Sequence, residues 1–85
     1  MKNKLSFQDA SESQIDYVKK IRGRILTELY YIDISEFDHI NKKHLTKEEI
    51  MNYISYKDDI YFFTQYKGVG TLEIISNVIF KMNKN

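Results

Sequence analysis

The chain has 85 residues, of which 42% are hydrophobic and 14% aromatic, and its formal net charge is +1. This length and composition predict one small globular domain rather than a disordered chain. The absence of cysteine from the sequence excludes disulfides and thiolate metal sites. Most nucleic-acid-binding domains carry a large excess of positive charge, which this near-neutral chain does not have.

Residues 1–10 form a polar lead, and we expect residues 11–85 to form the single globular domain. A first helix is predicted to begin at Ser11, because a serine followed three residues later by Gln14 is a capping box. The helix runs to about Tyr31, since apolar residues recur along it at spacings of three and four. These residues are Ile15, Val18, Ile21, Ile25, Leu29 and Ile32.

Two shorter helices are predicted after this one. Residues 35–43 carry apolar residues at a helical spacing, with capping residues in front of them. Residues 46–56 begin with a second capping box, formed by Thr46 and Glu49, and continue with an apolar stripe.

Residues 59–80 decide the fold class, because they fit two structures. Residues 60–66 are rich in strand formers, and residues 67–70 contain two glycines that suit a hairpin turn. The residues after them partly alternate between apolar and polar, but apolar residues also recur at helical spacing, with Thr71 placed to cap a helix. We predict an α+β fold with two or three N-terminal helices and a C-terminal β-hairpin. The alternative is a small all-α helical bundle.

No motif of a known catalytic chemistry occurs in the sequence. Gly68-Val69-Gly70 lacks the spacing of a phosphate-binding loop and is typical of a turn. His39 and His44 are five residues apart, which places them on different sides of a continuous helix, so we expect no metal site. We therefore predict a binding protein rather than an enzyme, with no cofactor and no small-molecule substrate.

The number of tyrosines favours a protein–protein interface. Tyrosine is common at interfaces because its ring is buried while its hydroxyl stays hydrogen-bonded. We predict a small inhibitor, immunity, antitoxin or accessory-type regulator whose partner is another protein or, through an uncovered strand edge, a second copy of itself. The predicted protein-binding residues are Tyr53, Tyr56, Tyr61 and Tyr66.

DNA is the alternative partner, since three helices followed by a hairpin are compatible with a winged helix-turn-helix. Residues 46–56 would then be the recognition helix, and residues 67–70 the tip of the wing. Glu48 and Glu49 count against this interpretation, because they lie in the first turn of that helix and would repel phosphates. The predicted nucleic-acid-binding residues are Lys42, Lys43, Lys47 and Lys67.

If the last segment is helical instead, two stretches resemble the helix-hairpin-helix unit in the C-terminal domain of the bacterial RNA polymerase α subunit: TKEEI at residues 46–50 and GVGTLEII at residues 68–75. Gly68, Thr71 and Leu72 match that family, in which the glycine precedes a helix that contacts DNA through backbone N–H groups. Val69 and Gly70 stand where the family tends to carry basic side chains. The resemblance covers under half of the chain and implies a DNA-binding regulator.

The sequence gives no sign of a membrane partner. No stretch is long and apolar enough for a membrane span, and the N-terminus has no apolar signal-peptide core. We therefore expect a cytoplasmic protein.

Overall fold

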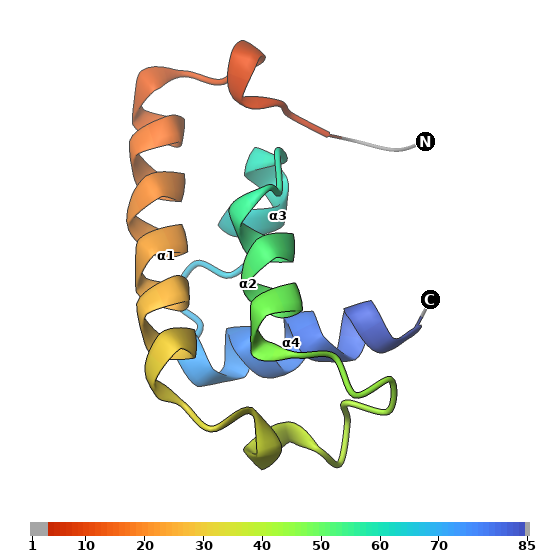
Figure 1. Ribbon diagram of the computed structural model, residues 1–85. Helices are drawn as coiled ribbons and strands as arrows, with labels where there is room; N and C mark the ends of the chain where they lie inside the picture. Colours follow the sequence, from red (N-terminus) through yellow and green to blue (C-terminus); the bar gives the residue numbers. More distant parts are fainter. Residues whose placement is uncertain (1–3, 85) are drawn as a thin grey trace.

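The computed structural model describes residues 4–84 as an arrangement of helices (Figure 1). In chain order the elements are η1 (Phe7–Asp9), α1 (Glu12–Tyr31), η2 (Ile34–Phe37), α2 (Lys47–Ser55), α3 (Ile60–Thr64) and α4 (Thr71–Lys84), where η marks a 3-10 helix. No strand occurs between residues 4 and 84. The predicted α+β fold is therefore wrong, and the all-α bundle given as its alternative is confirmed.

The predicted β-hairpin is replaced by α3, a turn and α4. In α4, Ile74, Ile75, Val78 and Ile79 are at most 1% exposed, and their spacing places them on one face of a helix. In a strand the adjacent members of each pair would point in opposite directions and need cover on both sides. Burial of the helical face outweighs the modest helix propensity of these β-branched residues. The wing predicted at residues 67–70 is a turn between two helices.

The helix predicted over residues 35–43 is also wrong. Only Ile34–Phe37 is helical, as a 3-10 turn. Beyond it the side chain of Asn41 holds a loop, because its Oδ1 accepts from the Leu45 N–H at 3.0 Å and its Nδ2 donates to the Leu45 carbonyl at 2.9 Å. Hydrogen bonds from side chains to the backbone compete with the backbone hydrogen bonds of a helix. A short segment can form only a few helical hydrogen bonds, so the side-chain bonds prevail here.

Both predicted capping boxes are confirmed. At the start of α1 the Gln14 N–H donates to Ser11 Oγ at 3.2 Å, and the Ser11 N–H donates to Gln14 Oε1 at 2.8 Å. At the start of α2 the Glu49 N–H donates to Thr46 Oγ1 at 3.1 Å, and the Thr46 N–H donates to Glu49 Oε1 at 2.8 Å. Each box fixes the start of its helix by satisfying N–H groups that have no partner within the helix.

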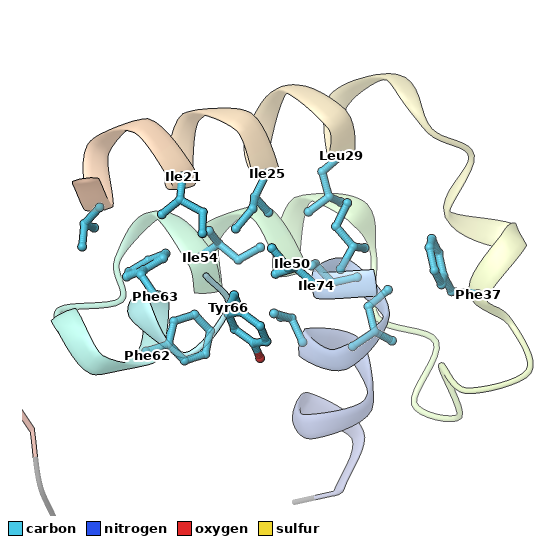
Figure 2. Packing of buried hydrophobic residues seen from close by; sticks show 14 of the residues in the cluster. Ile21, Ile25, Leu29, Phe37, Ile50, Ile54, Phe62, Phe63, Tyr66 and Ile74 are labelled. Atoms are coloured by element: carbon cyan, nitrogen blue, oxygen red, sulfur yellow. The ribbon is translucent and has the colours of Figure 1, made fainter. Parts of the chain in front are cut away.

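The apolar stripe of α1 faces the three other α-helices and forms the core with them. α1 and α2 lie side by side, and α4 lies across their direction (Figure 1). Figure 2 shows how side chains from all four helices fill the space between them. Residues that are at most 1% exposed include Val18, Ile25, Leu29, Ile50, Ile54, Ile60, Phe63 and Val78.

Residues 5–7 are attached to the turn between α2 and α3. The Ile60 N–H donates to the Leu5 carbonyl at 2.8 Å, and the Leu5 N–H donates to Asp59 Oδ1 at 3.2 Å. The Phe7 N–H donates to Asp58 Oδ1 at 2.9 Å. The two aspartates therefore bind backbone N–H groups of the polar lead.

Arg22 of α1 lies beneath this attachment. Its guanidinium carbon is 5.0 Å and 5.2 Å from the ring centroids of Phe7 and Phe63, and its Nη2 donates to the Lys57 carbonyl at 3.0 Å. Burial lowers the pKa of Arg22, while the Asp58 carboxylate acts in the opposite direction. An arginine remains charged despite such a shift. Arg22 therefore links Phe7, α1 and the turn after α2 through one half-buried cation.

Candidate functional site: a basic turn and an aromatic–lysine pocket

The turn between α3 and α4 brings a glycine and the start of a helix together. Gly68 has a φ of +80°, which favours glycine, and the Val69 N–H donates to the Tyr66 carbonyl at 2.9 Å. The Ile74 N–H donates to the Gly70 carbonyl at 3.0 Å, so Gly70 opens α4. The N–H groups in the first turn of a helix have no acceptor within the helix and carry partial positive charge. This end of α4 is therefore favourable for an anion.

One flank of α1 places cations beside this turn. Arg24 Nη2 lies 3.5 Å from Thr71 Oγ1, at the start of α4. Lys67 lines a hollow of about 270 Å³ together with Tyr17 of α1. Lys20 is three residues after Tyr17 and four before Arg24, so it lies on the same flank of the helix. We call residues 65–70 together with Lys20 and Arg24 the basic turn.

Two carboxylates lie close to the basic turn. Glu28 lines the same hollow as Arg24 and Thr71, and Glu73 is exposed in the first turn of α4. Nearby carboxylates therefore offset much of the charge of the three exposed cations. Binding of a polyanion there would consequently be moderate in strength and sensitive to salt.

The four lysines predicted to bind nucleic acid do not gather in one place. Lys67 belongs to the basic turn, whereas Lys47 Nζ donates to the Tyr30 carbonyl at 3.0 Å, at the end of α1. The Lys43 N–H donates to Asn83 Oδ1 at 2.6 Å near the end of α4, where Lys42 lines a small hollow. Sequence reasoning did not select Lys20 and Arg24, although their spacing on the polar side of α1 was a usable signal.

A second region is built around the ring of Phe62. The rings of Tyr53, Phe63 and Tyr66 meet it edge to face, with centroids 6.1, 5.0 and 5.7 Å away; Figure 2 shows Phe62, Phe63 and Tyr66 side by side. A pocket of about 370 Å³ lies next to this cluster. We call it the aromatic–lysine pocket, and its lining residues are Tyr53, Lys57, Asp59, Tyr61, Phe62, Gln65 and Lys81.

The two lysines of the pocket are both held over aromatic rings. Lys57 Nζ is 4.9 Å from the centroids of both Tyr53 and Phe62, and 3.2 Å from the Tyr53 hydroxyl. Lys81 Nζ is 5.7 Å from the Phe62 centroid and 3.2 Å from the Tyr66 hydroxyl. Cation–π attraction and these hydrogen bonds fix both ammonium groups beside one ring.

Three of the four tyrosines predicted to bind protein lie at this cluster. Tyr53 and Tyr61 line the pocket, while Tyr66 is only 5% exposed and contributes its hydroxyl to the position of Lys81. Tyr56 is 83% exposed and is not among the lining residues. The sequence analysis missed Lys81, which lies on α4 and reaches the cluster only because that segment is a helix.

Within residues 4–84, no group of three or more His, Asp or Glu residues is arranged to hold a metal ion, and no helix is long and apolar enough to cross a membrane. The chain matches no family model, and no curated protein or solved structure shows significant similarity to it. The function must therefore be argued from these two regions.

Proposed function

We propose that this protein acts by binding rather than catalysis, and that it binds duplex DNA through the basic turn. The observation that carries this proposal is the helix at Thr71–Lys84, which begins three residues after the left-handed Gly68. With this last segment helical, the sequence resembles the helix-hairpin-helix unit, in which backbone N–H groups at this position contact DNA. A DNA partner also agrees with the cytoplasmic location expected from the sequence.

The contacts would be made to phosphates. Arg24 lies beside Thr71 in the first turn of α4, and Lys20 and Lys67 add two cations along the adjoining flank of α1. Contacts of this type position a protein on the duplex without identifying bases, so we expect little sequence preference from this surface alone. The winged-helix version of DNA binding is not proposed, because the described chain has no wing.

The salt dependence follows from the number of cations. Three neutralised phosphates give a slope of about −2.7 for the logarithm of the binding constant against the logarithm of salt concentration, and affinity then falls about 40-fold between about 50 and about 200 mM salt. We would measure it by fluorescence anisotropy with a labelled random-sequence duplex.

A variant pair makes this titration specific for the basic turn. The triple variant K20M/R24M/K67M should lose most of the binding and nearly all of its salt dependence. The control K19M/K42M/K84M removes the same number of charges from exposed positions elsewhere and should keep most of the binding. Equal losses in both variants, or no binding by the unaltered protein at low salt, would refute the proposal.

A protein–protein interface is the second candidate function, and the gathering of Tyr53, Tyr61 and Tyr66 around Phe62 favours it. An inhibitor, immunity, antitoxin or accessory-type regulator would use such a surface. Alanine at all four predicted tyrosines should abolish capture of the partner if this candidate is correct; capture by a folded variant would refute it. Self-association through a strand edge is no longer supported, because the described chain has no strand.

A further inference from the structure

We infer that the aromatic–lysine pocket binds the carboxylate side chains of an acidic segment of a partner protein. This inference rests on the protein–protein interface proposed above and names the chemistry of the partner. The pocket shares none of its lining residues with the basic turn except Gln65, at the end of α3. It is therefore a different binding region from the one assigned to DNA.

The first argument is the preorganisation of the two cations. Lys57 and Lys81 are half-buried and are anchored over the Phe62 ring, 4.9 Å and 5.7 Å from its centroid. An exposed lysine loses side-chain entropy when it binds an anion, and anchoring reduces this cost. Two like charges beside one ring also repel one another, and an incoming anion relieves that repulsion.

The second argument concerns the N–H donors of Lys57 and Lys81 that remain available for a ligand. An ammonium group has three N–H donors. Lys57 Nζ bonds to the Tyr53 hydroxyl, and Lys81 Nζ bonds to the Tyr66 hydroxyl and to Gln65 Oε1 at 3.4 Å. Both ammonium groups can therefore donate to an added carboxylate.

The third argument is the charge balance of the pocket. Asp59 also lines it, and its Oδ1 already accepts hydrogen bonds from the N–H groups of Leu5 and Tyr61. Among the lining residues that the structure describes, two lysines and one aspartate leave a single excess positive charge, which matches an isolated carboxylate better than a multiply charged phosphate. The exposed ring of Tyr61 at the rim suits a peptide, since tyrosine is enriched at protein interfaces.

The test is an NMR titration of the isotope-labelled protein with the probe peptide acetyl-Glu-Tyr-Glu-amide, next to its neutral analogue acetyl-Gln-Tyr-Gln-amide. We expect saturable shifts at millimolar peptide for the Lys57 and Lys81 side chains and the Phe62 ring, at least tenfold weaker with the neutral peptide. The variant K57M/K81M should lose the response, and the control K19M/K42M should retain it. Methionine keeps most of the aliphatic stem of each lysine.

Each outcome has a distinct meaning. Equal responses to the acidic and neutral peptides would leave a protein-binding surface but overturn the acidic ligand. No response to either peptide, or an unchanged response in K57M/K81M, would overturn the inference altogether. The peptide comparison on the unaltered protein stands even if the double variant does not fold. DNA binding by K57M/K81M should match that of the unaltered protein, so the DNA proposal is judged separately.

Discussion

Two glycine-to-alanine substitutions should change stability in opposite directions, although neither added methyl group meets another atom. An alanine Cβ at Gly68 or at Gly23 would have no heavy atom within 4 Å apart from its chain neighbours and, at Gly23, the backbone of its own helix. Steric crowding therefore plays no part, and backbone conformation alone sets the sign. Gly68 has a φ of +80°, whereas Gly23 lies within α1.

The magnitudes follow from these conformations. Alanine in the left-handed region costs about 1 to 2 kcal/mol, so G68A should be destabilised by that amount. Alanine inside an exposed helix is about 0.8 to 1 kcal/mol more favourable than glycine, so G23A should be stabilised by that amount. For a domain of this size, 1 kcal/mol corresponds to a shift of about 4 to 8 °C in the midpoint of thermal unfolding.

The assay is urea unfolding followed by circular dichroism, with both variants and the unaltered protein measured side by side. The free energies of unfolding of the two variants should differ by about 2 to 3 kcal/mol. If G68A were as stable as G23A, the turn before α4 would not be left-handed in solution. The helical arrangement on which the DNA proposal depends would then be refuted.

Three further predictions concern the core, the loop after η2 and an exposed carboxylate. Phe63 is fully buried, so Phe63→Ala should cost about 3 to 5 kcal/mol in urea unfolding, and a cost below about 1 kcal/mol would contradict its central position. Asn41→Ala removes both side-chain hydrogen bonds to Leu45 and should lower the free energy of unfolding by about 1 to 3 kcal/mol. An Asn41→Asp variant should lose only part of this stability. The backbone N–H of Ser35 lowers the pKa of Asp33, so NMR titration should give a lower value in the folded than in the urea-unfolded protein. Asp33 then stabilises the fold above its ordinary pKa, and this contribution disappears as pH falls through the lowered one.

Local signals predicted α1 and α2 well, although the helix predicted between them over residues 35–43 is absent. Two capping boxes and one apolar stripe were enough to place α1 and α2 within one residue of their observed starts. These signals depend on atoms close in sequence, such as the Ser11 hydroxyl and the Gln14 N–H. They are therefore visible without knowledge of the rest of the fold.

The second half depends on contacts between distant residues. Strand-forming residues at 60–66 and 72–80 adopt helices because their apolar faces pack on α1 and are buried in the core that the four helices share. α3 has only five residues and would not be stable alone. The Asp59 side chain caps its start, but the burial of Ile60, Phe62 and Phe63 stabilises it, and this burial cannot be read from the local sequence.

The candidate sites likewise depend partly on local sequence patterns and partly on contacts between distant residues. Lys20 and Arg24 are recognisable as one flank of a helix, but their position beside Lys67 depends on how the turn before α4 meets α1. Lys57 and Lys81 come together only because Phe62 of α3 packs between α2 and α4. A core substitution such as Phe63→Ala would therefore disturb both regions at once, whereas K20M/R24M/K67M and K57M/K81M each change only one of them. Loss of DNA binding and of peptide binding in different lysine variants would establish that one small helical fold presents two independent surfaces.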